Sequence, residues 1–505
     1  MNSLSNPQST TRHAQTQAVL PQCAVFIHEN WFRLTAISLV VLGPCLWHRR
    51  IAAGDLGSHV YNAWLARLIH QGAAPGLSIA HPWTNVLFDF QLSALAPLFG
   101  WTAAQIIAVG LSVLIFFWGA FALASAASGR PSWYLVPCLA MVAYGWTLEM
   151  GFLNYFLALG LSTAGLAILW KGARWELLIP LALAPLIVLA NPLGLIWMLG
   201  GAAYIRLYEK LPRRFAVAVP SAAAATLLGL HRYFWTRYAV VRSSQPFYFF
   251  NGADQLLLFG NRYRLPSEAW LVFAAICLAA DIILRRREKG VWGKYAVALQ
   301  LYLLLAAVIA LLPDELRLPQ YAVGLSLLSP RFTSLSAICL ICILAVMQPR
   351  KWHLAGFTAI ALVFFSFLYQ DTAALNRMEQ QAEHLVHTLP PGQRVVGTIP
   401  KPMDSRVLID HMLDRACIGW CFSYGNYEPA SQAFRIRVQS ENPEVLADGQ
   451  DAADTQAGEY EVRPEDLPLY EIGFCVPHQE DLCLRPLQAG QQNGGGQTTE
   501  DDDTN

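Results

Sequence analysis

Residues 103–128 read AAQIIAVGLSVLIFFWGAFALASAAS and contain no charged side chain. About 20 apolar residues in a helix cross the ~30 Å hydrocarbon core of a bilayer, so this stretch is long enough to span a membrane. The rest of the chain has a similar character, because 55% of all residues are hydrophobic, 14% are charged and the mean hydropathy is +0.36. Soluble domains carry about 25% charged residues. The composition therefore predicts an all-α polytopic membrane protein and excludes a soluble globular one.

Further apolar segments on both sides of this stretch bring the predicted number of spans to about eleven, several of them close to the minimum of ~17 residues. Proline removes a backbone donor and restricts the residue before it. Asn191-Pro192 therefore predicts either a boundary between two spans or one long kinked helix. The predicted spans are residues 32–48, 103–128, 132–149, 152–169, 175–190, 193–208, 215–231, 268–284, 295–312, 332–348 and 353–369.

Basic residues gather in one set of the short connections between these segments. If the chain breaks at Asn191-Pro192, all of them fall on the same side, which the positive-inside rule assigns to the cytoplasm. This predicts an integral protein of an inner or plasma membrane, with a cytoplasmic N-terminus and an extracytoplasmic C-terminal domain. Residues 1–30 lack the apolar region of a cleavable signal peptide and are predicted to be disordered. The basic residues are Arg130, Lys171, Arg174, Lys210, Arg213, Arg214, Arg285, Arg286, Arg287, Lys289, Lys294, Arg350 and Lys351.

The predicted transmembrane domain covers residues 31–370 and includes an external loop at 49–102. Within this loop, residues 58–71 (SHVYNAWLARLIHQ) place apolar side chains at helical spacing, opposite polar ones. This pattern predicts an amphipathic helix that lies in the membrane interface. Residues 86–98 are a second candidate of the same kind. The alternative is a re-entrant loop packed against lipid.

The remaining residues predict a small α+β extracytoplasmic domain at 371–487. Residues 371–389 have the composition of an exposed helix, and the short apolar runs that follow are separated by Pro and Gly, as in small strand-containing domains. Residues 448–458 are acidic and rich in small side chains, and residues 488–505 are rich in Gly, Gln, Thr and Asp. Both segments are predicted to be disordered.

Cys417, Cys421, Cys475 and Cys483 belong to this C-terminal domain, whereas the other six cysteines lie in or near apolar segments and are expected to act as small hydrophobic residues. An extracytoplasmic location predicts persistent disulfides. A bridge between Cys417 and Cys421 requires a strained short loop, so we expect each of these two to pair with Cys475 or Cys483, in either arrangement. The alternative is four reduced thiols.

One acidic residue follows the first predicted span, in the sequence GDLGSHVYN at 54–62. A carboxylate at this depth is partly desolvated, which suits a general base, and it could also hold a divalent cation. If a helix begins near Asp55, then Asp55, His59 and Asn62 lie on one face. The alternative is that Asp55 only caps the helix.

An acid after the first span, an amphipathic external loop, many hydrophobic spans and an external C-terminal domain resemble the GT-C superfamily of integral membrane glycosyltransferases. The resemblance covers the whole chain as architecture and rests, as sequence, on the region of Asp55. It implies sugar transfer from a polyprenyl-phosphate-linked donor on the outer face, with Asp55 as base or metal ligand. Many members carry two close acids in this loop, whereas here the nearest second carboxylate is Asp89. That departure leaves the need for a divalent cation open.

Other polar residues are predicted to lie at the same external level. Glu149, in a short turn at 145–155, could line the acceptor or donor site, or could be an ordinary turn residue in contact with water. Arg331 precedes a span, and its guanidinium could clamp a lipid-linked phosphate. Arg262 and Arg264 form a second candidate pair. The alternative for an arginine at this level is contact with ordinary phospholipid headgroups.

The expected partners are membrane lipids and a lipid-linked sugar donor. No basic patch interleaved with aromatic residues is present, so nucleic acid is excluded. A transporter or flippase would place charged residues deep in several spans, and a non-catalytic membrane scaffold would not bring acids and arginines together. Asp281, four residues before Arg285, predicts an ordinary ion pair on one helix.

Overall fold

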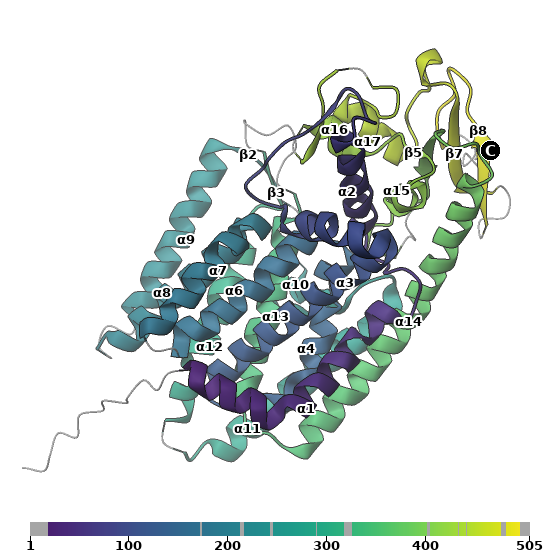
Figure 1. The fold of residues 1–505 in the computed structure, drawn as a ribbon. Coiled ribbons are helices and arrows are strands. Elements are labelled where there is room, and N and C mark those ends of the chain that lie inside the picture. Colours follow the sequence, from purple (N-terminus) through teal and green to yellow (C-terminus); the bar gives the residue numbers. More distant parts are fainter. Residues whose placement is uncertain are drawn as a thin grey trace, which may run out of the picture.

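The computed structural model describes residues 19–171, 174–212, 217–242, 246–288, 290–317, 326–400, 404–432, 434–440, 442–475 and 481–494. Long helices form a bundle, and a smaller C-terminal domain (residues 390–494) with a sheet sits at one end of it (Figure 1). The bundle consists of α1 (Val19–Leu46), α3 (Leu87–Ser128), η1 (Trp133–Leu135), α4 (Val136–Ala143), α5 (Trp146–Glu149), α6 (Leu153–Lys171), η2 (Arg174–Leu177), α7 (Leu178–Ala190), α8 (Pro192–Lys210), α9 (Ala218–Arg237), α10 (Phe247–Asn251), η4 (Ala253–Leu256), η5 (Asn261–Tyr263), α11 (Arg264–Arg285), α12 (Val291–Leu311), α13 (Leu328–Val346) and α14 (Lys351–Val386).

Within the described residues, seven helices are long and apolar enough to cross a membrane, which indicates an integral membrane protein. The other four predicted spans coincide with helices that are shorter or more polar, namely α4 with α5, α7, α8 and α9. The count of about eleven spans therefore stays a prediction. The seven helical segments are Ala24–Leu46, Leu87–Ser128, Leu153–Lys171, Asn261–Arg285, Val291–Leu311, Leu328–Val346 and Lys351–Val386.

The sequence predicts a helix boundary or kink at Asn191-Pro192, and the structure decides between the two. Asn191 is extended between α7 and α8 (φ −165°, ψ 128°), and its side chain accepts a hydrogen bond from the amide of Leu193 at 3.0 Å. Two separate helices are therefore present rather than one kinked helix. Within the predicted span 132–149, the chain leaves helical geometry at Tyr144 and Gly145, between α4 and α5.

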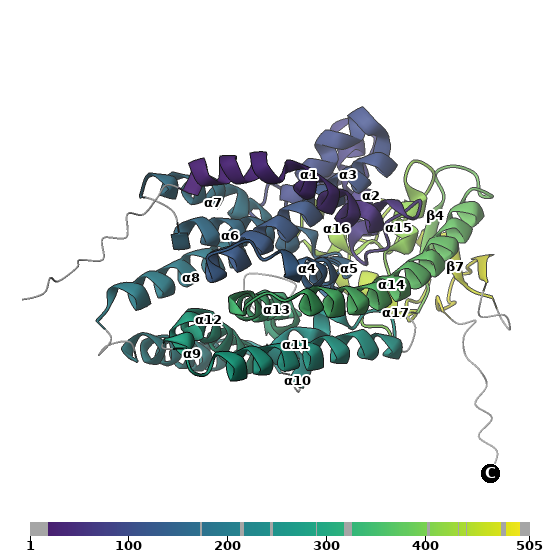
Figure 2. The same cartoon turned by 90° about the horizontal axis from the view of Figure 1, so that it is seen from below.

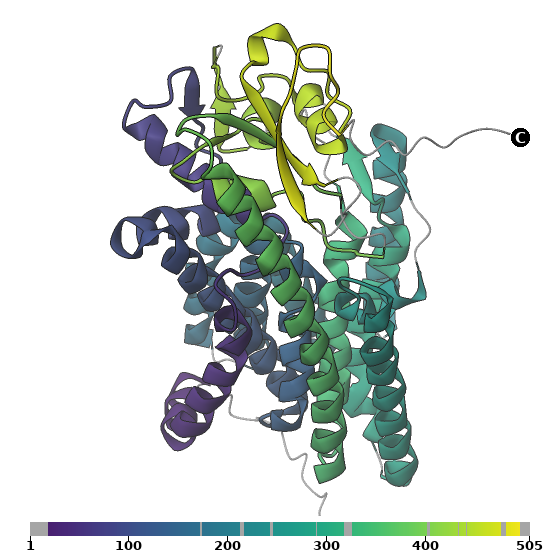
Figure 3. The same ribbon diagram turned by 90° about the vertical axis from the view of Figure 1, so that its right-hand side faces the viewer.

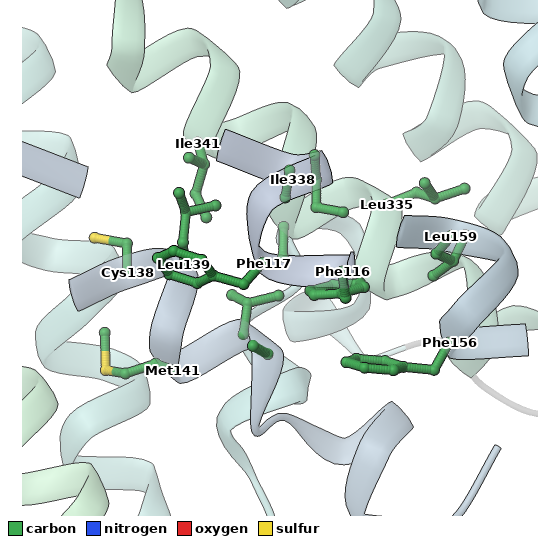
Figure 4. Packing of buried hydrophobic residues seen from close by; sticks show 14 of the residues in the cluster. Phe116, Phe117, Cys138, Leu139, Met141, Phe156, Leu159, Leu335, Ile338 and Ile341 are labelled. Atoms are coloured by element: carbon green, nitrogen blue, oxygen red, sulfur yellow. The ribbon is translucent and has the colours of Figure 1, made fainter. Parts of the chain in front are cut away.

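The bundle core is built on close contact between α3 and α6. A Cβ on Gly119 would lie 2.2 Å from the carbonyl oxygen of Gly160, so only glycine permits this approach. Phe116 and Phe156 stack beside it with ring centroids 4.3 Å apart. Leu335 and Ile338 of α13 close the same cluster (Figure 4), and all four of these apolar side chains are buried. Burial of each such side chain stabilises the fold by about 1.5–3 kcal/mol.

Besides the bundle helices, the described structure contains short helices and three small sheets, of which the β2–β3 sheet lies outside the C-terminal domain. The largest has the strand order β5-β4-β7-β8, in which β4 runs parallel to β5 and β7, and β8 is antiparallel to β7. The elements are α2 (Leu56–His70), β1 (Leu77–Ile79), β2 (Ala239–Val241), β3 (Glu315–Arg317), β4 (Arg394–Thr398), α15 (Met412–Cys417), β5 (Phe422–Ser423), α16 (Tyr427–Ser431), β6 (Ile436–Val438), α17 (Gly449–Ala457), η6 (Pro464–Asp466), β7 (Leu469–Phe474) and β8 (Leu482–Pro486).

One helix joins the two parts. α14 runs for 36 residues from the bundle to the C-terminal domain, and within the bundle it packs against α4 and α11 (Figures 2 and 3). The exposed helix predicted at 371–389 is its upper end. Ala382 and Val386 are fully buried there against the C-terminal domain. The predicted helix in the external loop also exists, as α2, but its apolar side chains Val60 and Leu65 are buried between the bundle and this domain. The expectation that this apolar face lies in lipid is therefore wrong.

The second predicted interfacial helix, at 86–98, is the first part of α3. A kink at Gly100 (φ 76°) separates it from the apolar stretch at 103–128. Leu98 and Phe99, just before the kink, are exposed.

Three predictions of disorder need correction. Residues 448–458 form α17 rather than a disordered insert, because Asp448 caps the helix and Ala452 and Thr455 are buried against the domain. The tail is ordered as far as residue 494, since Asn493 is buried and accepts a hydrogen bond from the amide of Tyr460 at 2.8 Å. α1 starts at Val19, so residues 19–30 are helical. Residues 1–18 and 495–505 lie outside the described residues.

The predicted crossing of the cysteines is also wrong. Cys417 pairs with Cys421, and Cys475 pairs with Cys483, with Cα–Cα distances of 4.6 and 5.1 Å. The turn after α15 brings the amide of Cys421 to 3.0 Å from the carbonyl oxygen of Cys417. In the antiparallel β7–β8 hairpin, Cys483 lies opposite Gly473, and Cys475 follows two residues later, just past the end of β7, so the hairpin brings these two cysteines close together. Each bridge thus closes a local turn instead of a long loop.

Candidate active site

Three stretches of backbone meet at Asp55, at the junction of the bundle and the C-terminal domain. The amide of Asp55 donates to the carbonyl oxygen of Met150 at 3.0 Å. A Cβ on Gly57 would lie 2.0 Å from the carbonyl oxygen of His411, and one on Gly151, which has φ +83°, would lie 2.4 Å from the amide of Asp55. Glycine is therefore required on both sides of Asp55 for these segments to touch.

The side chain of Asp55 does not cap the helix that it precedes. It makes no hydrogen bond to the first amides of α2, and the side chain is 24% exposed. The alternative explanation for this acid, helix capping, is therefore not realised in the structure. The carboxylate is left free to contact another group.

His59 and Asp89 form a first pair of charged groups beside Asp55. Nδ1 of His59 lies 2.9 Å from Oδ1 of Asp89, whose other oxygen accepts a hydrogen bond from Asn154 at 3.1 Å. Burial lowers the pKa of His59, but the adjacent Asp89 carboxylate outweighs burial and raises that pKa to about 9. The imidazole of His59 is consequently protonated at neutral pH.

His411 and Asp414 of the C-terminal domain form a second pair, which sequence reasoning missed. Nδ1 of His411 donates to Oδ2 of Asp414 at 3.0 Å, and Asp414 also accepts a hydrogen bond from the hydroxyl of Ser423. Nε2 of His411 lies 3.9 Å from Oδ1 of Asp55. Burial lowers the pKa of His411, but Asp414 and Asp55 outweigh it and raise that pKa to about 9. The spacing His411-x-x-Asp414 at the start of a helix was the available sequence signal.

Arg331 enters the same region from α13. Its guanidinium lies 4.2 Å from the ring centroid of Phe152, and its buried Nε atom has no hydrogen-bond partner among the described residues. It interacts electrostatically with Asp55 and Tyr427, whose ring lies 5.0 Å from that of His411. The structure therefore brings Asp55, Arg331 and the two histidine pairs to one place.

Asn62 and Glu428 connect α2 to the C-terminal domain. The side-chain amide of Asn426 donates to Oδ1 of Asn62 at 2.7 Å, and the side-chain amide of Asn62 donates to the hydroxyl of Ser58 at 3.0 Å. Its place on the face of Asp55 and His59 is as predicted, but its hydrogen bonds are structural. Glu428 accepts a hydrogen bond from the amide of Ile436 at 2.9 Å, and burial, with the nearby charge of Asp89, raises its pKa to about 7.

Of the other predicted residues, Glu149 contacts this group through its backbone, since its carbonyl oxygen accepts a hydrogen bond from the amide of Gly54 at 2.7 Å. The side chain of Glu149 is buried, with one oxygen unpaired in the described structure, and interacts with Tyr144 and Tyr263. Arg262 pairs with Asp371 of α14 at 2.5 Å. Arg264 is exposed at the start of α11. Arg262 is thus engaged in holding α14, whereas Arg331 is not paired in this way.

A buried ion network fixes the C-terminal domain beside the site. Arg415, next to Asp414 in α15, binds Glu379 of α14 at 2.5 Å and Gln105 of α3 at 2.7 Å. Arg50 binds the same Glu379 at 2.9 Å. A cavity of about 30 Å³ lies between this network and His411, with room for one or two water molecules.

In the described part of the chain, no group of three or more His, Cys, Asp or Glu side chains has a geometry that could hold a metal ion. Asp55 has His411 rather than a second acid beside it. A metal-binding role for Asp55 therefore remains a prediction.

Comparison of this chain with protein-family models, with curated proteins and with solved structures finds no match. The function must accordingly be argued from the residues and their geometry.

Proposed function

We propose that the protein is a membrane glycosyltransferase that transfers a sugar from a polyprenyl-phosphate-linked donor on the extracytoplasmic face of the membrane. The observation that carries this proposal is the state of Asp55. Its carboxylate is partly exposed, leaves the amides of its own helix unbound and lies 3.9 Å from the imidazole of His411. His411 is its one ion-pair partner among the described residues.

In this reaction Asp55 removes the proton from an acceptor hydroxyl. The hydroxyl oxygen bonds to the anomeric carbon of the sugar while the bond from that carbon to the phosphate oxygen breaks. The electron pair of this bond leaves with the polyprenyl phosphate. Arg331 stabilises the departing charge through its guanidinium, whose Nε has no hydrogen-bond partner among the described residues. A positioned general base contributes about 10²–10⁴-fold to such a reaction.

The place of the site supports a substrate with an apolar tail and a polar head. Asp55 and Arg331 stand where apolar helices meet the C-terminal domain. The two disulfides in that domain support an extracytoplasmic location, because disulfides persist in oxidising compartments. A non-catalytic scaffold would not require an acid that leaves its helix uncapped, or an arginine whose Nε has no hydrogen-bond partner among the described residues.

The test is sugar transfer by the purified full chain, in lipid nanodiscs, from a panel of polyprenyl-phosphate-linked sugars. Asp55→Asn keeps the shape of the side chain and should abolish transfer while the thermal unfolding midpoint stays the same. The matched control is Asp448→Asn, because Asp448 also precedes a helix, α17, but its carboxylate accepts hydrogen bonds from the first amides of that helix, so this variant should retain full transfer. Transfer that survives in Asp55→Asn would remove Asp55 from the mechanism.

A further inference from the structure

The C-terminal domain holds the external loop through one segment, residues 426–432 and 434–438, which we call the clasp. Its strand β6 pairs with β1 in antiparallel register, and the side-chain amide of Asn426 donates to Asn62 of α2 at 2.7 Å. We propose that the clasp is a pH-responsive strap beside the candidate site, closed in acid and loosened when Glu428 ionises. Such a strap controls access to the site whichever reaction takes place there.

The clasp reaches the candidate site at one end and α3 at the other. Tyr427 of the clasp interacts electrostatically with Asp55. Farther along, the guanidinium of Arg435 donates to the hydroxyl of Ser93 in α3 at 3.3 Å, and the amide of Ala80 donates to the carbonyl oxygen of Arg435 at 2.7 Å. Release of the second end therefore frees the segment that carries Tyr427 beside Asp55.

Glu428 joins the two ends of the clasp. It is 7% exposed, and its Oε1 accepts a hydrogen bond from the amide of Ile436, the first residue of β6, at 2.9 Å. Ile436 is in turn the register partner of Ile79 in β1. The carboxyl group thus holds the strand whose pairing closes the clasp.

Three charged groups act on Glu428 in the closed clasp. Burial, together with the charge of Asp89 in α3, raises the pKa of Glu428 from 4.5 to about 7, although His59 of α2 and Arg435 oppose this rise. His59 and Asp89 bind each other at 2.9 Å on the far side of the contact. That pair therefore stays intact when the clasp opens, whereas Glu428 enters water.

The acids on the neighbouring elements of the C-terminal domain are already engaged. Asp414 of α15 is bound to His411 at 3.0 Å. On α17, which packs against α16, Asp451 is bound to Arg463 at 2.7 Å, and Asp448 caps the helix. All these contacts lie within the domain, so opening of the clasp leaves them in place.

The raised pKa of Glu428 determines the direction of the response. Below pH 4.5 the carboxyl is neutral in both the closed and the open clasp, so the closed form is then most stable. As the pH rises through 7, the closed clasp must bury a charge that the open clasp exposes to water. With pKa values of 4.5 in the open form and about 7 in the closed form, the ratio of open to closed clasp should rise about 70-fold between pH 5 and pH 8.

The test is hydrogen–deuterium exchange of the full chain in lipid nanodiscs at pH 5, 6.5 and 8, corrected for the intrinsic exchange rate at each pH. The reporters are the amides of Ala80 and Gln439, which close the contact between β1 and β6. Their protection should fall by about 70-fold from pH 5 to pH 8 in the wild type. Glu428→Gln still offers an acceptor to β6 but carries no charge, so its protection should stay constant. Glu459→Gln, which changes an exposed glutamate of the same domain, is the matched control and should respond like the wild type.

Protection that does not change with pH in the wild type overturns the proposal, and so does an equal change in folded Glu428→Gln. If Glu428→Gln fails to fold, Arg435→Gln decides. Arg435 lowers the pKa of Glu428, so its loss should move the midpoint of the response to higher pH, and an unmoved midpoint overturns the proposal. None of these outcomes depends on sugar transfer, so the clasp and the proposed function stand or fall separately.

Discussion

Asp55 and Asp448 both stand directly before a helix, α2 in one case and α17 in the other. Asp448 accepts hydrogen bonds from the amides of Gln450 and Asp451 at 2.7 and 3.3 Å, as an N-cap does. Asp55 makes no such bond. The two acids look alike in sequence, and each precedes a run of small or polar residues. The neighbouring segments alone explain why Asp448 caps its helix whereas the carboxylate of Asp55 does not.

The difference arises from crowding by distant segments. At Asp55, the turn around Met150 and the chain around His411 press against the start of α2, and these contacts fix the backbone without the carboxylate. At Asp448 no such segments are needed, because the side chain itself satisfies the first amides of α17. The carboxylate of Asp55 does not cap its helix and faces His411 instead, and the following experiments test that distinction.

Asp55→Ala should show the largest effect. Because no cap is lost, we expect the free energy of unfolding to change by less than about 0.5 kcal/mol. Sugar transfer should fall by about 10²–10⁴-fold, since the general base is gone. Transfer assays and chemical unfolding on the same preparation measure both. A loss of stability with normal transfer would show that Asp55 acts only as a helix cap, as Asp448 does.

The buried ion network beside Asp55 and the exposed ion pair of α17 should contribute differently to the free energy of unfolding. Arg415→Leu leaves Glu379 short of a partner in a buried network and should cost about 3–5 kcal/mol of stability. Arg463→Leu removes the exposed pair with Asp451 of α17 and should cost no more than about 1 kcal/mol. Thermal unfolding of both variants is the measurement. Equal losses would mean that the network at the site is not buried in the folded protein.

The histidine pair beside Asp55 should make stability depend on pH. The pKa of His59 is about 9 in the folded protein and about 6.5 in the unfolded chain. The contribution of a raised pKa is fully present below pH 6.5 and is lost as the pH rises through 9. The loss should reach about 3 kcal/mol at most and should shrink in His59→Gln. Unfolding curves at pH 6, 7.5 and 9 test this, and His384→Gln should keep the wild-type slope.

Asp448→Ala should show the smallest effect. Removing an N-cap side chain costs about 1 kcal/mol, and transfer should remain at the wild-type level. Chemical unfolding and the transfer assay measure the two quantities. A transfer defect as large as that of Asp55→Ala would erase the contrast between the two acids.

Much of the bundle could be predicted from the sequence because lipid makes apolar length the dominant signal. The apolar stretch at 103–128 lies within α3, Asn191 separates two helices, and Asp281 pairs with Arg285 at 3.0 Å. The C-terminal domain could not be predicted as well. Short local turns determine which of its cysteines pair. Burial of Thr455 and Asn493 orders two polar segments that were predicted to be disordered.

The candidate site was predicted only where it depends on residues near one another in the chain. Asp55, His59 and Asn62 share a helix face, so spacing alone brought them together. His411 lies far along the chain and reaches Asp55 only because Gly57 permits close contact between the two segments. Arg262 pairs with Asp371, whereas the Nε of Arg331 has no partner among the described residues. This difference depends on which helix packs against each arginine. The periodicity of the sequence does not say which helices become neighbours.

The unbroken course of α14 limits how this protein can change over evolution. Each residue of a helix adds about 100° of rotation and 1.5 Å of rise. One residue gained or lost between Tyr369 and Glu379 would swing Glu379 away from Arg50 and Arg415, and would carry the C-terminal domain with it. Loops elsewhere can lengthen or shorten at little cost. In α14, the number of residues itself sets a dimension of the site.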